Sequence, residues 1–515
     1  MSRSGESRLD ELVEGGLVLR SLAGNDDLDR VVACAAEVFG SRDASLLNDL
    51  FRHHPHADPR DLLYIEDPAA GRVVSTLTLI PWSLSYEGVD LPAAEMAIVA
   101  TLEGYRRRGL SRRLTAAFMA RLRERGCLIS HIQGIPYFYR QFGYEYAMPL
   151  EGGLRLEGRQ ISDAGGADQK ADSGAGGADQ KASSAGGGAE QRADSAAVGA
   201  EQKADSAAGG AEQNTDSTAG ATEQKSDSAG SDGTARFTFR LATPKDIADL
   251  MRLYEEAAED LAIHTRRGPE IWEYVLTHGI GSCTEAETWV VERQGGNRSA
   301  AGVGGTRGTT GGKGASRGKA PVVAGYFRLP KFHFNEELRL SEASRLSADA
   351  ALAVLQHLKK LMTERKTPGI QLNDVPHGAL MRLARALGAT DLGTYPWQIL
   401  IPDPAAFLRA LAPVWERRIA ESPFAGLTRA VAINLYRRTI ELNFADGRVS
   451  EVIDRGPTED HGIQIPPGLF AQLAMGWRTQ EELRAIYPDV IIARGERMLV
   501  DTLFPKRPGF LHQVY

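Results

Sequence analysis

Five arginines surround Gly109 in the stretch GYRRRGLSRRL, residues 104–114. Arginine side chains bind phosphate oxygens through paired hydrogen bonds, and a glycine lets a ligand approach the backbone closely. Three interpretations compete: a nucleic-acid patch, a charged helix face and a seat for a phosphorylated cofactor. The residues that follow Gly109 and the charge of the whole chain distinguish them.

The residues after Gly109 have the spacing of an amphipathic helix. Apolar side chains recur at every fourth position and predict a buried stripe of Leu110, Leu114, Phe118 and Leu122. The arginines expected outside this stripe are Arg112, Arg113, Arg121 and Arg123. Gly109 then stands at the helix N-terminus, where unpaired backbone N–H groups and the helix dipole favour a pyrophosphate.

The net charge of −7 is concentrated in one segment of the chain. Residues 163–233 carry 13 acidic and 5 basic side chains, a net of −8, so the remainder is close to neutral. A nucleic-acid-binding protein carries a basic excess over a whole domain. The charge therefore argues against a nucleic-acid partner and favours the phosphate seat.

The three cysteines, Cys34, Cys127 and Cys283, are isolated and form no CxxC pair. This usage favours a reduced, cytoplasmic protein. The N-terminal residues lack the apolar core of a signal peptide, and the sequence has no apolar run of membrane-spanning length. We therefore expect no membrane partner.

Two low-complexity segments interrupt the chain. Residues 164–229 contain six near-copies of an 11-residue unit such as AGGADQKADSG, without a large apolar side chain. Such a segment cannot bury enough surface to offset its ordering entropy, so we expect 161–235 to be a disordered linker. Residues 295–320 are rich in glycine, serine and threonine and separate two strand-like runs, which predicts a long, disordered hairpin loop.

The remaining sequence forms three pieces of alternating strand and helix patterns. In the first, 1–160, Asp26 and Asp27 are cap-type residues before a helix, and further strands precede the arginine helix. The second, 236–400, opens in the same order, from which we infer an internal duplication. The third, 401–515, has the pattern of a compact α+β domain.

Arg106, Gly109 and Ser111 in RRRGLS resemble the R/Q-x-x-G-x-G/A loop of GNAT-family N-acetyltransferases. The preceding MAIVAT resembles the family strand that splays from its neighbour and pairs with the pantetheine arm of acetyl-CoA. Downstream, YFYRQFGYE, residues 137–145, is similar to the family element that contributes a general acid. The resemblance implies an acetyl-CoA site, without metal, formed by Val99, Ala100, Thr101, Arg106, Arg107, Arg108, Gly109, Leu110, Ser111, Arg112, Gly134 and Ile135.

The order of the three pieces resembles the "enhanced intracellular survival" (Eis) acetyltransferases. Their third domain is similar to sterol carrier protein 2 (SCP2), and TIELNFADGRV and LFPKRPGFLHQVY read like that module. The implied α/β (α+β) fold is two tandem GNAT domains, 1–160 and 236–400, followed by an SCP2-like α+β domain, 401–515. The second domain has no counterpart of RRRGLS, so we expect it to shape the substrate pocket rather than bind acetyl-CoA.

The resemblance assigns the general acid to Tyr139, with Tyr137 and Tyr144 as weaker candidates. In Eis-type enzymes the C-terminal carboxylate reaches the first domain's active site, which makes Tyr515 the implied general base. Glu95 is the alternative, since other GNAT enzymes place a catalytic glutamate on that strand, and water is a third. Acetylation needs no covalent enzyme intermediate, so we expect Cys127 to be a packing residue.

His53, His54 and His56 in HHPH do not predict a metal site. Adjacent histidines do not face one ion from a regular element, and no carboxylate or cysteine stands at ligand spacing. We expect these residues to line a solvated loop or the acceptor side of the cleft.

The implied reaction is transfer of an acetyl group to a primary amine. The leading acceptors are aminoglycoside antibiotics or other polyamines, which connects the chain to antibiotic resistance. Alternatives are protein or peptide lysines, or a non-catalytic lipid or ligand carrier that uses the SCP2-like domain. The family also implies a homo-oligomer, with a hexamer among the options.

Overall fold

The computed structural model describes residues 9–162, 237–294, 321–332, 336–459 and 462–515. Met1–Ile161 and Ala235–Tyr515 form one compact unit. The repeats at 164–229 and the loop at 295–320 lie outside the described residues, so the predicted disorder of both segments stays a prediction.

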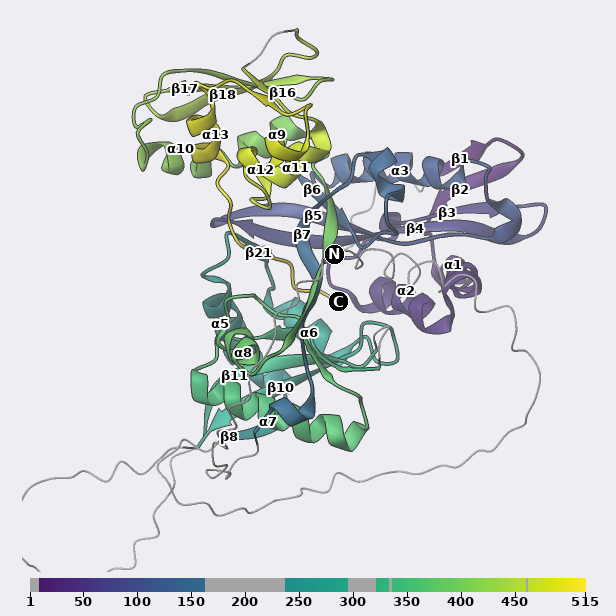
Figure 1. Ribbon diagram of the computed structural model, residues 1–515. Coiled ribbons are helices and arrows are strands. Elements are labelled where there is room, and N and C mark those ends of the chain that lie inside the picture. The colour runs from purple at the N-terminus through teal and green to yellow at the C-terminus, as the bar shows by residue number, and fades with distance from the viewer. Residues whose placement is uncertain (1–8, 163–236, 295–320, 333–335, 460–461) are drawn as a thin grey trace, which may run out of the picture. The chain divides into compact units, whose positions relative to one another are not determined.

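The first piece contains the strands and helices that the patterns predicted, together with β1 and α2, which they did not predict (Figure 1). Its elements are β1 (Asp10–Val13), β2 (Leu17–Ser21), α1 (Asn25–Phe39), α2 (Ser41–His53), β3 (Leu62–Asp67), β4 (Arg72–Tyr86), β5 (Val89–Thr101), α3 (Leu110–Glu124), β6 (Ile129–Ile132) and β7 (Glu145–Leu156). The expected capping of α1 is wrong in detail. Gly24 is the N-cap, and the Asp27 carboxylate, in the first helical turn, accepts a hydrogen bond from Ala23 N–H at 3.3 Å.

The second piece also follows the predicted order. Its elements are β8 (Phe237–Leu241), α5 (Ile247–Ala258), β9 (Ile263–Thr265), α6 (Pro269–Thr277), β10 (Ala286–Arg293), β11 (Val322–Pro330), β12 (Leu338–Leu340), β13 (Glu342–Ala343), α7 (Ala348–Arg365), β14 (Ile370–Leu372), α8 (Ala379–Ala386) and β15 (Thr390–Leu400). Strands β10 and β11 pair antiparallel, as a hairpin around residues 295–320 requires.

In the third piece, helices pack on a separate five-stranded sheet ordered β18-β17-β16-β19-β20. Its elements are α9 (Pro404–Ala410), α10 (Ala412–Ala420), β16 (Arg429–Asn434), β17 (Thr439–Ala445), β18 (Arg448–Asp454), β19 (Ile463–Gln464), α11 (Pro467–Ala474), α12 (Gln480–Ile486), β20 (Ile491–Ile492), α13 (Arg497–Leu503) and β21 (Gly509–Phe510). Strand β21 belongs to the C-terminal tail and lies outside this sheet, where it pairs with β9.

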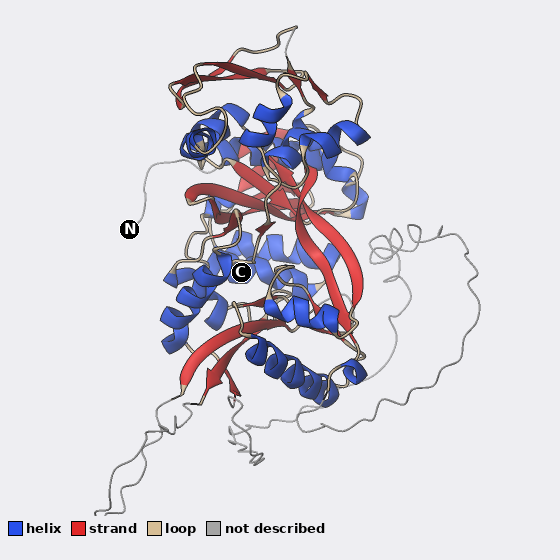
Figure 2. Ribbon diagram, turned by 60° about the vertical axis from the view of Figure 1, so that its left-hand side comes forward, coloured by secondary structure: helices blue, strands red, loops and turns tan. Residues whose placement is uncertain are grey.

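One sheet joins the first two pieces. Its strand order is β1-β2-β3-β4-β5-β6-β15-β7-β14-β12, with β9 paired to β4. Strand β15 of the second piece therefore lies between β6 and β7 of the first. In Figure 2 the long strands, in red, curve through the unit between groups of blue helices. The mixed α/β fold was predicted, whereas the interleaving of these strands was not.

Helix α3 packs as its apolar spacing predicted, with Leu114, Phe118 and Leu122 fully buried. The expected exposure of Arg121 is wrong, because this side chain is 6 % exposed and reaches across to the start of β3. Its Nε donates to the fully buried Asp61 carboxylate at 2.9 Å, and Arg125 pairs with the same carboxylate at 3.0 Å. This ion cluster fixes the helix that begins at Gly109.

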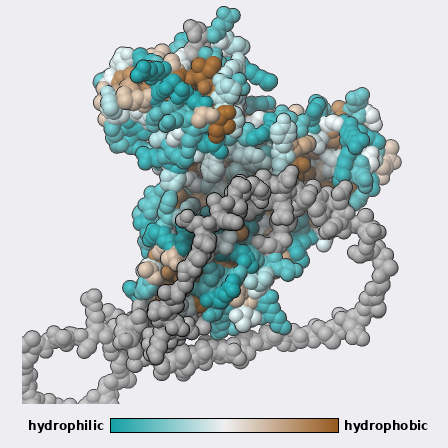
Figure 3. All heavy atoms as spheres, in the orientation of Figure 1, coloured by the Kyte–Doolittle hydropathy of each residue, from teal (hydrophilic) through white to brown (hydrophobic). Residues whose placement is uncertain are grey.

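No helix among the described residues is both long enough and apolar enough to cross a membrane. On the face shown in Figure 3 most of the surface is hydrophilic, and the hydrophobic residues form small separate patches.

We predict that Asp61→Ala lowers the free energy of unfolding by about 3–5 kcal/mol, because it removes the fully buried carboxylate that pairs with the buried Arg121 and the half-buried Arg125. Urea denaturation followed by circular dichroism measures this loss. The matched control is Glu124→Gln, which removes the exposed partner of the same Arg121. This control is expected to cost at most about 1 kcal/mol. Equal losses for the two variants would contradict the proposed role of the Asp61 cluster.

Candidate active site

Strands β5 and β6 diverge at Glu95. Their parallel pairing is confined to residues 93–95 of β5, and the last pair joins Glu95 to His131. Beyond Glu95, β5 remains paired with β4 only, and its register shifts where Ile98 adopts a left-handed φ of 46°. Val99 and Thr101 therefore lie along an opening between the strands, where a ligand can pair with the β5 backbone.

The turn before α3 has the geometry of an anion seat. Gly109 is the N-cap with φ 74° and ψ 9°, a left-handed conformation that favours glycine. A Cβ at this position would meet nothing within 4 Å, so the backbone angle, rather than packing within the protein, requires the glycine. Arg113 N–H donates to Gly109 O at 3.1 Å. The N–H groups of residues 110–112 precede this first helical bond and have no main-chain acceptor among the described residues.

The arginines of the predicted site surround this turn, and their side chains are exposed. Arg106 Nε lies 3.4 Å from Thr101 O, and the Arg108 guanidinium lies 4.8 Å from the Tyr105 ring centre. Arg112 Nη2 lies 3.4 Å from Gln141 Oε1. Four arginines thus add positive charge around the free N–H groups; they are Arg106, Arg107, Arg108 and Arg112.

A pocket of about 560 Å³ opens at the same turn. Its walls come from the α3 turn and the β1–β2 hairpin: Leu12, Val13, Glu14, Gly15, Leu17, Arg108, Gly109, Leu110 and Arg113. An ion pair between Arg113 and Glu11 joins the two walls. The hairpin was not predicted, because the polar run DELVEGG carries no strand alternation that sequence reasoning recognises.

A chain of hydroxyl groups links β4, β5 and α3. Ser75 Oγ lies 2.8 Å from Thr101 Oγ1, which lies 3.5 Å from Ser111 Oγ. Ser111 therefore stands beside the end of β5, as the small residue of the predicted loop. The contact fixes the α3 turn against the open strand.

Tyr139 is 7 % exposed and packs directly on Gly134. A Cβ at Gly134 would lie 2.2 Å from the tyrosine ring, so the position requires glycine. Gly134 O accepts a hydrogen bond from Gln398 Nε2 at 3.0 Å, whereas the neighbouring Ile135 is 57 % exposed. Burial raises the pKa of Tyr139 well above its ordinary value, which keeps the phenol protonated at neutral pH.

The two weaker tyrosine candidates have other surroundings. The Tyr144 hydroxyl is 2.7 Å from Ser130 Oγ and fully buried. Tyr137 is 75 % exposed, with a left-handed φ of 68°. Tyr139 is thus the buried tyrosine of this element whose hydroxyl has no hydrogen-bonding partner among the described residues.

The last residue of the chain contacts Glu95. The Tyr515 hydroxyl donates to Glu95 Oε2 at 2.7 Å, and both side chains are buried. The Tyr515 ring lies edge-to-face against Trp82, with ring centres 6.1 Å apart. The tail therefore ends at the point where β5 and β6 separate.

Aromatic side chains from neighbouring strands surround Glu95. The rings of Trp82 and His131 lie 4.5 Å apart, those of His131 and Trp397 lie 4.8 Å apart, and His131 Nε2 is 3.9 Å from Glu95 Oε2. The Trp397 indole nitrogen and both imidazole nitrogens of His131 are buried without a hydrogen-bonding partner among the described residues. Buried polar atoms of this kind mark a place for water or ligand. Sequence reasoning missed all three aromatics, because each lies within an apolar strand run.

This cluster is electrically neutral at neutral pH. Burial raises the pKa of Glu95 to about 8, although the hydrogen bond from Tyr515 opposes that rise. Burial lowers the pKa of His131 to about 3, so its imidazole is uncharged. The contact between Glu95 and His131 is therefore not an ion pair.

The three cysteines are free thiols. Burial raises the pKa of Cys127 to about 11 and that of Cys34 to about 12, so neither is an activated nucleophile. Burial likewise raises the pKa of Cys283 to about 12.

The HHPH histidines do not share one site. His53 stacks on His278 with ring centres 4.3 Å apart, and Asp49 is near both. One possible ligand atom from each of these three residues lies within 4.8 Å of the others, so the expectation that no carboxylate stands near these histidines is wrong. Both oxygens of Asp49 already accept hydrogen bonds, from Gly279 N–H and the Tyr274 hydroxyl. We therefore assign no metal there.

The sequence of the first piece matches a known family model. The acetyltransferase (GNAT) domain model matches residues 19–147, which include β5, the Gly109 turn and Tyr139. Residues 19–147 are a GNAT acetyltransferase domain. Members of this family use acyl-CoA. No curated protein gives a match.

Several solved structures share the fold along nearly the whole chain. A GCN5-related N-acetyltransferase from Anabaena variabilis has a TM-score of 0.55 at 14 % identity, covering 96 % of this chain and 99 % of its own. A probable N-acyltransferase from Enterococcus faecalis has a TM-score of 0.58 at 12 % identity, covering 97 % and 100 %. Eis1 from Mycobacterium abscessus has a TM-score of 0.52 at 14 % identity, covering 95 % and 98 %. The chain therefore carries the domain and the fold of an N-acetyltransferase.

We predict that Gly109→Ala weakens coenzyme A binding by about tenfold, because a left-handed alanine costs roughly 1–2 kcal/mol and distorts the turn. Isothermal titration calorimetry with coenzyme A measures the change. The matched control is Gly126→Ala, just beyond the other end of α3, where φ is also positive and space is also open. We expect this control to lose comparable stability and to bind coenzyme A normally. Weakened binding in both variants would show that the turn has no special role.

Proposed function

We propose that the chain transfers an acetyl group from acetyl-CoA to a primary amine, and that the amine reacts beside Glu95. The observation that carries the proposal is the separation of β5 from β6 directly after Glu95. The opening extends toward the Gly109 turn, which supports a phosphate seat, and begins where Tyr515 contacts Glu95. One continuous edge thus connects a cofactor seat to a buried carboxyl group.

The residues along this edge fit acetyl-CoA. Free N–H groups at residues 110–112 and the surrounding arginines suit a pyrophosphate, and the unpaired edge at Val99 and Thr101 suits an amide-containing arm. When bound, acetyl-CoA supplies a thioester carbonyl for attack and a thiolate leaving group. Ala100 and Leu110 contribute backbone to the same walls, and Gly134 with Ile135 completes them at the end of β6.

Tyr139 is the proposed general acid. Its raised pKa keeps the proton on the phenol at neutral pH, and its hydroxyl is free to donate to a departing sulfur. Its packing on Gly134 holds the ring in one place.

Glu95 is the proposed general base, with Tyr515 orienting its carboxyl group. A pKa of about 8 lies close to working pH, which suits a group that must accept a proton and release it again. The Tyr515 hydroxyl donates to Oε2 and so fixes the orientation of the carboxyl group. The terminal carboxylate of Tyr515, which the Eis resemblance implies as base, is the second candidate, since the same residue carries it.

The proposed acceptor is a polycationic small molecule of the aminoglycoside type. The resemblance to Eis enzymes names this class, and carboxylates near Tyr515 support it. Tyr274 and Cys283 both influence the pKa of Tyr515. Tyr274 donates to Asp49, and Cys283 interacts with Asp43, so helix α2 brings two acidic side chains toward this region. Ammonium groups are attracted to such acidic side chains.

We predict that thiol release from acetyl-CoA is faster with aminoglycosides than with lysine peptides. With the better acceptor, we predict that Glu95→Gln lowers kcat by about 10²–10⁴-fold, because it removes the proposed base. In the parent protein kcat/KM should rise with pH and level off near 8, where Glu95 becomes ionised. That rise should disappear in Glu95→Gln. The control is Glu66→Gln, a buried carboxylate on β3 paired with Arg30, which should keep the pH profile. A full rate for Glu95→Gln would remove Glu95 from the mechanism.

The same carboxyl group predicts a pH dependence of stability. Its pKa is raised from 4.5 to about 8 in the folded chain, so the folded state holds an extra proton between these values. The stabilisation is fully present below pH 4.5 and is lost as pH rises through 8, at up to about 1.4 kcal/mol per pH unit. Denaturation at several pH values should show this slope in the parent protein and its absence in Glu95→Gln. Identical slopes would contradict the raised pKa.

We predict that a short extension beyond Tyr515 abolishes turnover while coenzyme A still binds, because Tyr515 is buried and added residues would displace it from Glu95. Tyr515→Phe, which keeps the terminal carboxylate, separates the two candidate bases. If Glu95 is the base, the loss of the phenol hydrogen bond should raise the pKa of Glu95 and shift the rise of kcat/KM to higher pH. An unchanged pH profile would favour the terminal carboxylate of Tyr515 as the base. Full activity of the extended protein would exclude Tyr515 both as the base and as the residue that orients Glu95.

A further inference from the structure

The C-terminal tail is held by main-chain and side-chain hydrogen bonds from the second piece of the chain. Strand β21 pairs in parallel with β9, matching Gly509 to Ile263 and Phe510 to His264. The Thr265 hydroxyl donates to His512 O at 2.8 Å. Since β9 also pairs with β4, these contacts connect the tail to the strand that carries Trp82.

We propose that Arg267 is the positioning residue that holds the chain end against Glu95. Its Nη2 donates to Gln513 O at 2.5 Å, two residues before Tyr515. Its Nη1 donates to Glu342 Oε1 at 2.8 Å. One planar guanidinium thus joins the tail backbone to a buried carboxylate. The inference rests on the proposed function, because it assigns the tail a role in catalysis.

The neighbours of Arg267 hold its guanidinium group in a single orientation. The side chain is 0 % exposed and lies over the rings of Tyr254 and Trp272, at 4.8 and 5.0 Å from their centres. Glu342 is held in turn by the Tyr326 hydroxyl at 2.6 Å. Each neighbour of the guanidinium is therefore fixed, and the fork presents its second arm to Gln513 O.

A purely structural explanation accounts poorly for a charge at this place. Burying an ion pair costs desolvation free energy, and well-packed apolar side chains of similar volume often serve stability as well. What an apolar side chain cannot supply is a rigid donor to the tail backbone. Placement of the last residues is therefore the gain that a buried arginine provides here.

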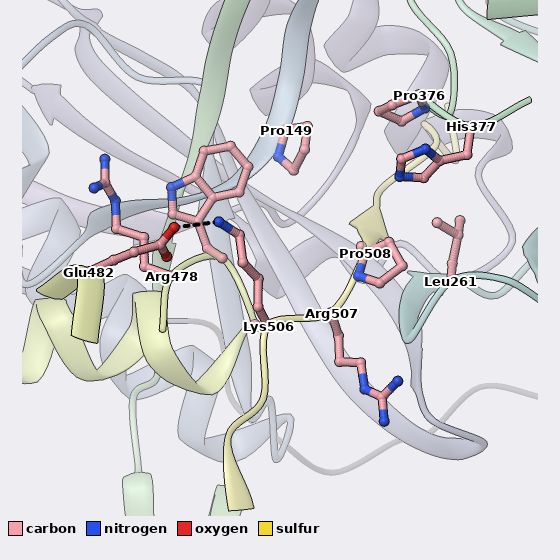
Figure 4. Close-up of a pocket in the computed structure, with 12 residues that line it drawn as sticks. Pro149, Leu261, Pro376, His377, Arg478, Glu482, Lys506, Arg507 and Pro508 are labelled. Atoms are coloured by element: carbon pink, nitrogen blue, oxygen red, sulfur yellow. Dashed lines mark hydrogen bonds and ion pairs between the residues drawn. The ribbon is translucent and has the colours of Figure 1, made fainter. Parts of the chain in front are cut away.

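The upstream end of the tail is anchored in the third piece. Arg507 N–H donates to Gly476 O at 3.1 Å, and Lys506 pairs with Glu482 at 2.6 Å. These residues border a pocket of about 560 Å³, in which Lys506 reaches toward Glu482 while Arg507 points away (Figure 4). In Figure 1 the yellow tail runs from the third piece past β21 to the C mark. Arg267 then fixes the downstream end.

The second piece of the chain therefore holds the C-terminal tail in place, a role that does not require a cofactor motif. It supplies strand β9, which pairs with the tail, and Arg267, which follows β9 in the sequence. It also supplies Glu342, which lies on β13 and holds Arg267. An acetyltransferase domain with this tail displaced would keep its cofactor seat and lose Tyr515 from the reacting region.

The test compares Arg267→Lys with Arg328→Lys. Arg328 is the matched control, because it is also buried and lies 3.9 Å from the same Glu342, yet it makes no hydrogen bond to the tail. Thr265→Val is a second, milder variant that removes only the bond to His512 O. Each protein is assayed for acetyl transfer and for release of Tyr515 by a carboxypeptidase that prefers aromatic C-terminal residues.

We expect Arg267→Lys to lower kcat by about 10²-fold, as a misplacement on the order of 1 Å does, with KM for acetyl-CoA within about twofold. Tyrosine release should become about tenfold faster, because the tail detaches more often. Thr265→Val should change both readouts in the same direction by a smaller factor. Arg328→Lys should release tyrosine at the parental rate.

Three results would overturn the proposal. Tyrosine release at the parental rate in Arg267→Lys would show that the arginine does not hold the tail. Equal release from Arg328→Lys would show a general packing role. Faster release with unchanged kcat would separate tail position from catalysis. Tyrosine release needs no acetyl transfer, so an inactive parent protein would refute the proposed function while the anchoring result still stands.

Discussion

The hydrogen bond between Tyr515 and Glu95 joins residues 420 positions apart in the sequence, and the candidate site depends on it. Glu95 lies on a central strand of the acetyltransferase domain, whereas Tyr515 arrives through the third piece and past a strand of the second. A carboxyl group at this depth can exist only if its neighbours compensate for lost water. The tyrosine hydroxyl provides part of that compensation, and the site is complete only when all three pieces are folded.

Strand β5 is paired differently on the two sides of Glu95. Up to Glu95 it is paired with β6 and forms part of a continuous sheet, and after Glu95 that pairing ends. The left-handed Ile98 turns the strand away from its regular register with β4. A β-bulge commonly directs backbone groups at functional sites. The sheet thus creates the open edge without a separate loop, and α3 closes the far end with the Gly109 turn.

Much of this arrangement could be predicted from the sequence, because local patterns determine it. The apolar stripe of α3 fixes the helix, and a glycine at its start fixes the turn; both were predicted. Arg121 shows where such reasoning ends, since its burial depends on Asp61, a residue far away in sequence. Trp82, His131 and Trp397 were missed for a similar reason. They lie on three different strands, and β15 reaches its place between β6 and β7 from the second piece, which no local pattern specifies.

The neutrality of the Glu95 cluster bears on how a charged acceptor would react there. An amine attacks as the free base, while aminoglycoside-type molecules arrive as ammonium ions. In the proposed reaction, carboxylates on α2 would attract the cation, whereas the buried cluster of Glu95, His131 and indoles would disfavour an unpaired positive charge. The pKa of the ammonium group therefore falls as the group approaches Glu95, whose own pKa is raised to about 8. Burial moves the two pKa values toward each other, so proton transfer needs little free energy in those molecules in which the Glu95 carboxyl group is ionised.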